Sequence, residues 1–317
     1  MAVRAYAPAS AGNISVGFDI LGAAFAPVDG SPLGDFVTVR EGSSSFELIC
    51  QGPFASKLPQ DPRQNIVTTA WEDFCHEIAR KGVSPRDLTM ILDKRLPVGS
   101  GLGSSACSIV AALAALNAFH GSPLSQDELL RLMGKEEGRI SGSIHYDNVA
   151  PCYLGGIQLM AEECGTISVT VPHFREWFWV SCYPGICVST AEARKILPDS
   201  YDRHTCIDFG RQVALFVHAS FSGNRRLASA VLRDVLAEPY RRSLIPGFDR
   251  AREASLRLGA LAFGISGSGP SVFAVTPDQG TAEQVDRWLR SNFISNENGF
   301  SHICRIDGTG ARVEEVQ

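Results

Sequence analysis

A glycine-rich loop that leads directly into an apolar helix constrains this chain most. Residues 96–106 read Leu-Pro-Val-Gly-Ser-Gly-Leu-Gly-Ser-Ser-Ala, so Gly99, Gly101 and Gly103 alternate with other residues before two serines. Residues 107–117 are mostly small and apolar, which predicts a buried helix. Glycines let several backbone N–H groups point toward one place, and a helix N-terminus adds partial positive charge there. The stretch therefore predicts an anion site, and phosphate is the usual occupant.

Two familiar phosphate-binding patterns differ from this loop. A P-loop would place a lysine directly after its last glycine, whereas Gly103 is followed by two serines. A dinucleotide fingerprint would place its third glycine later and an acidic residue about 20 positions further on. A serine-capped glycine turn without a ligand is the simpler alternative. The glycines, the two hydroxyls and the uncharged helix occur together, which favours the phosphate interpretation.

The loop resembles the second motif of the GHMP kinases, the small-molecule kinases that act on galactose, homoserine, mevalonate and phosphomevalonate. That motif is a proline, a short spacer and Gly-Leu-Gly-Ser-Ser-Ala, and residues 97–106 contain every element. Residues 8–19 resemble the first motif in the form seen in homoserine-phosphorylating members, Pro-Ala-Ser-x-x-Asn-x-x-x-Gly-Phe-Asp. Residues 264–270 resemble the third, glycine-rich motif. The three motifs occur in the family's order and extend the resemblance over nearly the whole chain.

The resemblance implies an α+β fold of two domains with the active site between them. The N-terminal, nucleotide-binding domain is expected to be ribosomal-protein-S5-like, with a left-handed βαβ unit, and the C-terminal domain ferredoxin-like. The sequence itself suggests a boundary near residue 165, because the composition changes between the pair Gly155-Gly156 and Pro172. We therefore expect domains at residues 1–165 and 166–317.

The resemblance assigns the glycine-rich loop to ATP. Its expected nucleotide-binding residues are Pro97, Gly99, Ser100, Gly101, Leu102, Gly103, Ser104 and Ser105. Asn65 opens a helical pattern that ends near Gly82, and its side chain predicts a helix N-cap. The family places the start of this helix near the nucleotide base, so Asn65 is also a weaker nucleotide-binding candidate. A capping box at Ser125 predicts another helix, which we expect to end near Gly138.

Glu137 falls where the family places a magnesium-binding glutamate, and the Ser105 hydroxyl is a candidate ligand beside it. Mg²⁺ prefers hard oxygen ligands and often takes only one or two of them from the protein. The resemblance thus implies ATP and Mg²⁺ as cofactors, with Ser105 and Glu137 in both catalytic and metal-binding roles. A transition-metal site of Glu137, His145 and Asp147 is an alternative. One histidine beside carboxylates lacks the ligand number and spacing of zinc or iron sites.

Seven polar residues match positions at which homoserine-phosphorylating members contact their substrate: Asn13, Asp19, His145, Asn148, Thr190, Arg194 and Arg241. The pattern alone offers simpler roles, in a turn, a polar loop or a solvated surface. The resemblance implies that Asp19 pairs with an ammonium group and that Arg194 and Arg241 hold a carboxylate, which their forked donors match. Thr190 and Arg194 are four residues apart and share a helix face. One acid with two arginines describes an amino acid.

Asn148 marks a departure from part of the family. Mevalonate-kinase-like members carry an aspartate there as a candidate base, and an asparagine amide accepts no proton for that purpose. Asp147 is adjacent, but a side chain one step along the chain usually points elsewhere. The chain therefore uses another base or none. Phosphoryl transfer tolerates the second option, because positioning and charge stabilisation supply most of its catalysis. Asn148 is still expected to orient the acceptor hydroxyl.

The activity that the resemblance implies is ATP-dependent phosphorylation of the side-chain hydroxyl of L-homoserine, giving O-phospho-L-homoserine for threonine biosynthesis. One alternative is another GHMP kinase that acts on a hydroxy acid or a sugar. The presence of Asp19 and the absence of an aspartate at Asn148 disfavour it. A second alternative is a catalytically silent relative that binds a small molecule or a partner protein. The intact Ser105, Glu137 and glycine motifs disfavour that alternative.

Composition excludes several function classes. A net charge of −5 offers no basic surface for nucleic acid. The longest apolar run, residues 109–116, is far shorter than the roughly 20 residues that span a bilayer, and the first residues lack the pattern of a signal peptide. The nine cysteines are scattered without a Cys-x-x-Cys pair, as is typical of proteins from a reducing compartment. We expect a cytoplasmic homodimer with neither nucleic-acid nor membrane partners.

Overall fold

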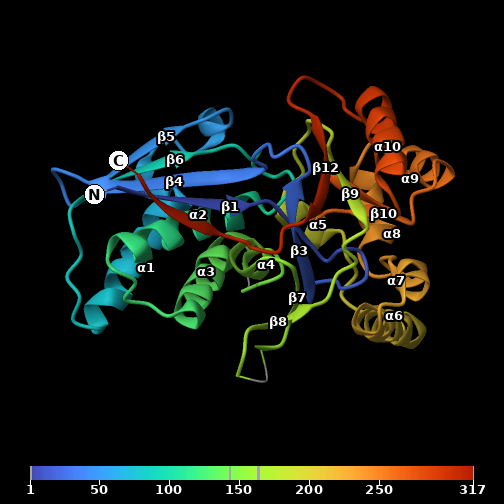
Figure 1. Ribbon diagram of the computed structural model, residues 1–317, viewed down its shortest axis with the longest axis horizontal. Coiled ribbons are helices and arrows are strands. Elements are labelled where there is room, and N and C mark those ends of the chain that lie inside the picture. Colours follow the sequence, from blue (N-terminus) through green and yellow to red (C-terminus); the bar gives the residue numbers. More distant parts are fainter. Residues whose placement is uncertain (1, 143, 163–164, 317) are drawn as a thin grey trace.

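The chain folds into two β-sheets that lie side by side, each covered by helices (Figure 1). A computed structural model describes residues 2–142, 144–162 and 165–316. The fold is mixed α+β. Its two halves meet around the glycine-rich loop that leads into helix α2.

The N-terminal sheet has five strands in the order β13-β1-β4-β6-β5. Its strands are β1 (Ala2–Pro8), β4 (Gly34–Glu41), β5 (Phe46–Gln51), β6 (Leu88–Asp93) and β13 (Arg312–Val316). The strand β5 runs parallel to β6, and helix α1 (Ile66–Arg80) connects them as a βαβ unit. The strands β4 and β5 flank residues 42–45 in the sequence, but β6 lies between them in the sheet and pairs with both.

One face of this sheet packs against the helices, and a buried helix lies at its centre. The helices are α1, α2 (Ser104–Phe119), α3 (Gln126–Ser141) and α4 (Val149–Leu154), with short 3₁₀ turns at Ala55–Lys57 and Pro62–Gln64. Helix α2 is buried along almost its whole length and contacts β1, β4, α1 and α3. A helix that is apolar on all sides belongs in a protein interior, which confirms the sequence expectation.

Helix α3 starts as predicted but ends later. Both hydrogen bonds of the capping box form, between Ser125 and Glu128. The helix does not end near Gly138, as expected, but continues to Ser141 and stops at Gly142, which has a left-handed φ of 84°. A left-handed residue ends a helix readily when it is glycine. Glu137 therefore lies a full turn before the end of the helix.

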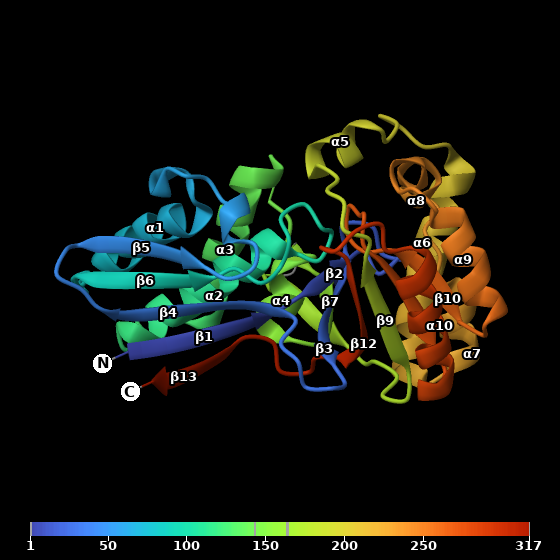
Figure 2. The same ribbon diagram turned by 90° about the horizontal axis from the view of Figure 1, so that it is seen from above.

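The second sheet has eight strands, all paired antiparallel, in the order β10-β11-β9-β12-β3-β7-β8, with β2 paired to β3. They are β2 (Ser10–Gly12), β3 (Leu21–Pro27), β7 (Ile157–Met160), β8 (Ser168–Val171), β9 (Phe178–Tyr183), β10 (Ala262–Ile265), β11 (Val272–Thr276) and β12 (Phe300–Ile306). The helices of this half are α5 (Thr190–Lys195), α6 (Arg203–Ser222), α7 (Arg225–Val231), α8 (Glu238–Arg241), α9 (Phe248–Arg257) and α10 (Gln279–Asn292), with a 3₁₀ turn at Arg242–Leu244. Helices α9 and α10 cover this sheet, and α5 stands apart at the junction of the halves (Figure 2).

The two halves exchange strands. The last strand, β13, returns to the N-terminal sheet and pairs with β1, so that Ala2 lies opposite Val316 and the chain ends are neighbours. In the other direction, β3, β7 and β8 extend the sheet that β9 to β12 form. The halves are therefore fastened together by main-chain pairing in both sheets. The domain limits 1–165 and 166–317 stay a prediction.

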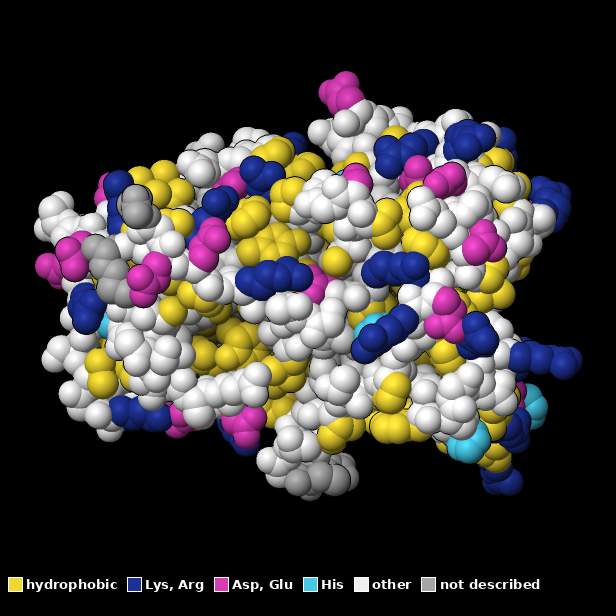
Figure 3. All heavy atoms as spheres, viewed as in Figure 1, with side chains coloured by type: hydrophobic (Ala, Val, Ile, Leu, Met, Phe, Trp, Pro, Cys, Tyr) yellow, Lys and Arg dark blue, Asp and Glu magenta, His cyan; other side chains and the backbone are white. Residues whose placement is uncertain are grey.

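The surface carries mixed charge. Figure 3 shows basic and acidic side chains interspersed over the face viewed there, without a large area of one sign. Among the described helices, none has the length and apolar character needed to span a bilayer.

Candidate active site

The glycine-rich loop needs its glycines for two physical reasons. Gly99, Gly101 and Gly103 have φ values of 67°, 78° and 63°, in the left-handed region that glycine adopts without strain. The loop is also packed closely by other segments. A Cβ at Gly101 would lie 2.4 Å from the Ser266 carbonyl oxygen, and one at Gly103 would lie 2.2 Å from the Ser10 hydroxyl. Side chains would therefore push the neighbouring segments away from the loop.

The loop's carbonyl groups are used within the protein. Four consecutive carbonyl oxygens accept hydrogen bonds of 2.7–3.2 Å from other segments: Gly99 from Val188, Ser100 from Ser271, Gly101 from Ser266 and Leu102 from Ser10. Within the described ranges, no N–H group of residues 99–103 donates a hydrogen bond. The carbonyl groups are thus turned into the protein, while the amides of the same residues remain available. Amide donors in front of the α2 N-terminus form a site for phosphate oxygens.

The three sequence motifs meet around this loop. In the first motif, the Asn13 amide donates to the Gly267 carbonyl oxygen of the third motif at 3.2 Å. The Gly267 N–H in turn donates to the Gly12 carbonyl oxygen at 3.2 Å. Asn13 and Asp19 have left-handed φ values of 72° and 60°, and the Asn13 side chain accepts from the Asp19 N–H at 2.8 Å. Asn13 therefore shapes its own loop as well as joining two motifs.

Glu137 and Ser105 lie together, where the late part of α3 approaches the first turn of α2. Burial raises the pKa of Glu137, while the neighbouring Ser105 hydroxyl and the charge of Lys94 lower it. The pair presents a carboxylate and a hydroxyl beside the loop amides. These are the hard oxygen donors that suit Mg²⁺, and so the residues present fit that ion.

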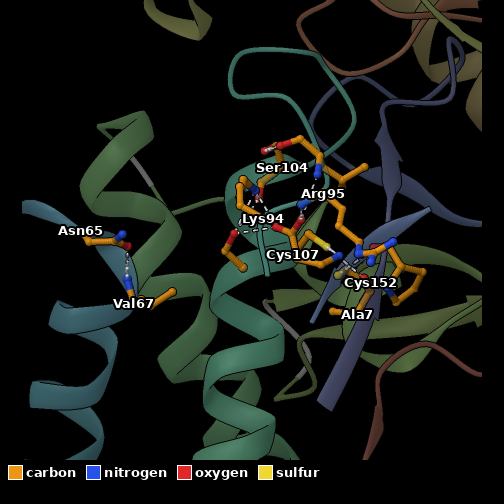
Figure 4. A network of polar contacts seen from close by, with 12 residues as sticks. Ala7, Asn65, Val67, Lys94, Arg95, Ser104, Cys107 and Cys152 are labelled. Atoms are coloured by element: carbon orange, nitrogen blue, oxygen red, sulfur yellow. Dashed lines mark hydrogen bonds and ion pairs between the residues drawn. The ribbon is translucent and has the colours of Figure 1, made fainter. Parts of the chain in front are cut away.

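A buried ion pair beneath the loop was not predicted from the sequence. Lys94 follows β6, Asp35 lies in β4, and their side chains are 2% and 0% exposed. The Lys94 Nζ lies 2.5 Å from the Asp35 carboxylate and also donates to the carbonyl oxygen of Ser104 at 2.8 Å (Figure 4). The only sequence indication was a lysine standing two residues before Leu96, where the loop begins.

Asp19 and Arg194 form a two-pronged ion pair across the junction. The two terminal nitrogens of the Arg194 guanidinium lie 3.1 and 3.0 Å from the two carboxylate oxygens of Asp19. The side chains are 31% (Arg194) and 27% (Asp19) exposed. His145 lies near enough for both charges to act on its pKa: burial lowers this pKa most, Asp19 raises it and Arg194 lowers it. Thr190, on the same helix, lies 3.3 Å from the Ser268 hydroxyl of the third motif. The structure brings these predicted substrate contacts together.

Arg241 is buried, not solvated as its pattern alone suggested. It is 3% exposed, and its guanidinium lies 5.2 Å from the centre of the Phe18 ring. Its Nε donates to the Ala193 carbonyl oxygen at 2.9 Å, and another nitrogen donates to the Gly267 carbonyl oxygen at 3.2 Å. Arg241 thus connects α8 with α5 and with the third motif. It lies close to Arg194, whose charge helps to lower the pKa of Arg241 after burial.

Asn148 and Asp147 both face the junction. The Asn148 carbonyl oxygen accepts from the Ser10 hydroxyl and the Gly12 N–H, each at 3.1 Å. The expectation that Asp147 points elsewhere is wrong: its carboxylate lies against Gly12, and the Asn148 amide is 3.4 Å from it. The two residues form a turn before α4, which directs successive side chains to one side. Burial and the charge of Asp19 raise the pKa of Asp147 to about 7.

Asn65 is confirmed as a helix cap. Its side chain is 1% exposed and accepts from the Val67 N–H at 3.2 Å, while its amide donates to the Cys50 sulfur at 3.5 Å (Figure 4). Both ends of the side chain are therefore engaged within the protein. Its contact with a nucleotide stays a prediction.

The fold and the site are those of a phosphotransferase for small molecules, with the loop amides on one side and the charged pair of Asp19 and Arg194 on the other. Residues 65–156 match the model of the GHMP kinases N terminal domain, and residues 215–295 match that of the GHMP kinases C terminal. A crystal structure of homoserine kinase from Cytophaga hutchinsonii has a TM-score of 0.89 and 30% identity, with 99% of this chain and 97% of that chain covered. The chain belongs to the GHMP kinase family, whose members generally use ATP and Mg²⁺.

More distant solved structures share the fold. Mevalonate kinase from Methanococcus jannaschii has a TM-score of 0.71 at 13% identity, over 96% of this chain and 98% of that chain. Phosphomevalonate kinase from Streptococcus pneumoniae has a TM-score of 0.70 at 14% identity, over 92% and 96%. At these identities the likeness concerns the fold alone, and the acceptor has to be argued from the pocket.

Proposed function

We propose that this GHMP kinase transfers the γ-phosphoryl group of ATP to the side-chain hydroxyl of L-homoserine, giving O-phospho-L-homoserine for threonine biosynthesis. The observation that carries the proposal is the ion pair between Asp19 and Arg194 at the junction of the two halves. The 30% identity to the homoserine kinase from Cytophaga hutchinsonii, over almost the full length of both chains, also supports it.

An amino acid matches the charges of this pocket. Its ammonium would take the place of Arg194 beside Asp19, and its carboxylate would take the place of Asp19 beside Arg194. A ligand with only one of the two charges would leave one member of the pair without its counter-charge, which is costly in a half-buried site. Arg241 would add a second guanidinium for the carboxylate, and His145 and Thr190 line the same pocket.

The loop of residues 97–105 would bind the triphosphate through its free amides and the α2 N-terminus. Ser105 and Glu137 would hold Mg²⁺ beside it. When bound, that ion neutralises charge on the phosphate oxygens. The chain's own residues position the two substrates and exclude competing orientations, which accounts for most of the rate enhancement in phosphoryl transfer.

The proposed transfer proceeds without a protein base. The homoserine hydroxyl oxygen forms a bond to the γ-phosphorus, the bond from that phosphorus to the β,γ-bridging oxygen breaks, and ADP leaves. The hydroxyl proton passes to an oxygen of the transferred phosphoryl group or to water. Asn148 and Asn13 are the proposed orienting residues for the acceptor. Asn148 suits this role because two hydrogen bonds from Ser10 and Gly12 fix its side chain.

A coupled ADP-release assay with MgATP tests the proposal. The acceptors are L-homoserine, 4-hydroxybutyrate, mevalonate, galactose and L-threonine, each at the same concentration. We expect turnover with L-homoserine alone, because only it combines both charges with a reachable primary hydroxyl. Faster turnover with mevalonate or galactose would keep the kinase and reject the amino-acid pocket. Binding of ATP without turnover of any acceptor would favour a silent relative.

Two further features stay predictions. A homodimer in solution would be tested by size-exclusion chromatography with light scattering. The assignment of Asn65 to the nucleotide would be tested by the Kd of MgATP for Asn65→Asp, which keeps an N-cap acceptor.

A further inference from the structure

A buried ion pair lies beneath the phosphate loop, and the mechanism above does not use it. Lys94 and Asp35 are almost fully buried, and Lys94 Nζ lies 2.5 Å from the Asp35 carboxylate. Taking two charges out of water costs several kcal/mol for each ion, so a buried pair seldom stabilises a fold more than apolar residues of similar size. Stability alone is therefore a weak explanation for this pair.

The pair's other hydrogen bonds go to both ends of the loop. Where the loop begins, one oxygen of Asp35 accepts from the Arg95 N–H at 2.8 Å and from the Leu96 N–H at 2.9 Å. Where the loop ends, Lys94 donates to the carbonyl oxygen of Ser104, the first residue of α2, at 2.8 Å. A single ion pair thus joins the entry and the exit of the loop (Figure 4).

A third side chain joins this pair to α2. The Ser108 hydroxyl donates to the Asp35 carboxylate at 2.7 Å and accepts from Lys94 at 2.9 Å. Between the two ends, the loop carries three glycines in left-handed conformations. Glycine segments lose much conformational freedom on ordering, so a loop of this kind depends on fixed ends to keep its amides in place.

We propose that Asp35 and Lys94 are positioning residues of the nucleotide site, which hold the two ends of the loop so that its amides are aimed at the phosphates before ATP arrives. Amides that are already in place need no ordering when the ligand binds, and this raises affinity without any direct contact. The inference rests on the ATP-binding part of the proposed function and is independent of the acceptor.

The test removes both charges together, because removal of one alone would leave an unpaired buried charge. In the double variant Asp35→Asn with Lys94→Met, the new amide oxygen can still accept from Arg95 and Leu96, while the link to Ser104 is lost. Titration calorimetry with MgATP, without any acceptor, gives the Kd. We expect it to rise by about tenfold or more, the loss expected from a hydrogen bond to a charged group. The KM for L-homoserine should stay within about twofold, because Asp19 and Arg194, the proposed contacts for the charges of the acceptor, lie outside the loop.

The chain offers a matched control in Asp307 and Arg312. One oxygen of Asp307 likewise accepts from two consecutive backbone amides, of Thr309 at 2.9 Å and Gly310 at 3.2 Å. Its other oxygen pairs with Arg312 at 2.7 Å, but this pair lies between β12 and β13 and not under the loop. The double variant Asp307→Asn with Arg312→Met should change the melting temperature and leave the Kd of MgATP within about twofold of wild type.

Three results would overturn the inference: an unchanged Kd in the folded Asp35→Asn, Lys94→Met protein, an equal rise in the control protein, or an equal rise in the KM for L-homoserine. If the double variant does not fold, the Kd of MgATP for Ser108→Ala is the deciding measurement. This variant removes the hydroxyl that joins the pair to α2 and retains the pair itself. A rise in Kd of about threefold supports the inference, and no rise rejects it. Absence of turnover with homoserine would reject the proposed acceptor without affecting these binding data.

Discussion

The two sides of the candidate active site are built in different ways. On the nucleotide side, the loop carbonyls are tied to three other segments and the loop ends are tied to a fully buried ion pair. On the acceptor side, the main polar contact is the half-exposed pair of Asp19 and Arg194, and the helix that carries Arg194 is only six residues long. One side is fixed by the fold, whereas the other is held by charges that a ligand can take over.

This difference separates two tasks. Phosphates are alike in every nucleoside triphosphate, so a rigid array of amides binds them without discrimination and at low entropic cost. The acceptor must be selected among many small hydroxyl compounds. An ion pair that only a ligand with both charges can replace provides such selection, because any other ligand leaves a charge unmatched. Variants on the two sides should therefore affect different kinetic constants.

The largest effect is expected from Glu137→Gln on the nucleotide side. The amide removes the charge beside Ser105 but keeps the size, so kcat should fall by roughly 10² to 10³ and the dependence of the rate on Mg²⁺ should weaken. Initial rates over a range of Mg²⁺ concentrations at saturating L-homoserine measure this. The neighbouring Ser105→Ala, which removes a neutral ligand, should be milder. A rate equal to wild type would remove Glu137 from the metal site.

The second variant, Arg194→Leu, acts on the acceptor side. Without the guanidinium, the ligand carboxylate has no partner at this position and Asp19 is left unpaired. The KM for L-homoserine should therefore rise by roughly 10- to 100-fold. The Kd of MgATP should remain within about twofold of wild type, because the loop does not depend on this pair. An unchanged KM for homoserine would remove Arg194 from the pocket. Equal losses for both substrates would contradict the division between the two sides.

Gly101→Ala tests the rigidity of the loop itself. The residue has a left-handed φ of 78°, and the added Cβ would meet the Ser266 carbonyl oxygen at 2.4 Å. We expect the Kd of MgATP to rise by about tenfold, because the loop must move away from the third motif. Gly82→Ala is the control, since Gly82 has a φ of 77° but no atom within 4 Å of its Cβ position. A similar rise in both proteins would mean that a general loss of stability, and not the packing of the loop against the third motif, is responsible.

Local features of the chain could be predicted from the sequence because they depend on neighbouring residues. The helix after the loop, the N-cap at Asn65 and the capping box at Ser125 follow from patterns of a few residues. The end of α3 could not be predicted in this way, because Gly138 and Gly142 can both end a helix and tertiary packing decides between them. The strand β13 was missed since its residues are exposed and its partner β1 lies at the other end of the chain.

Most candidate site residues were found from motifs, and their partners were not. Nothing in the spacing of Asp19 and Arg194 indicates that the two side chains meet, because their contact spans 175 positions. The pair of Asp35 and Lys94 lies outside every motif, and its meaning comes from hydrogen bonds to the loop ends. The direction of the Asp147 side chain depends on the turn before α4, which the sequence pattern did not specify.

The smallest effect is expected from Asp147→Asn, and it concerns the ionisation of a buried carboxyl group on the acceptor side. Burial first, and the charge of Asp19 second, raise the pKa of Asp147 from its ordinary 3.8 to about 7 in the folded protein. Between these values the folded state binds more protons than the unfolded state, so this carboxyl lowers stability as the pH rises from 4 to 7. The variant cannot ionise there. Its melting temperature relative to wild type should therefore increase from pH 5 to pH 8 by a few degrees, at about 2 °C for each kcal/mol.

The same measurement with saturating L-homoserine sharpens the contrast between the two sides. A bound ammonium beside Asp19 would offset the repulsion between the carboxylates of Asp19 and Asp147, so the gain of the variant at pH 8 should shrink. MgATP, which we propose binds to the loop, should stabilise both proteins equally and leave the gain unchanged. A difference in melting temperature that stays constant from pH 5 to pH 8 would show that Asp147 ionises as it does in water. In that case the acceptor pocket would hold no unrelieved negative charge for an ammonium to neutralise.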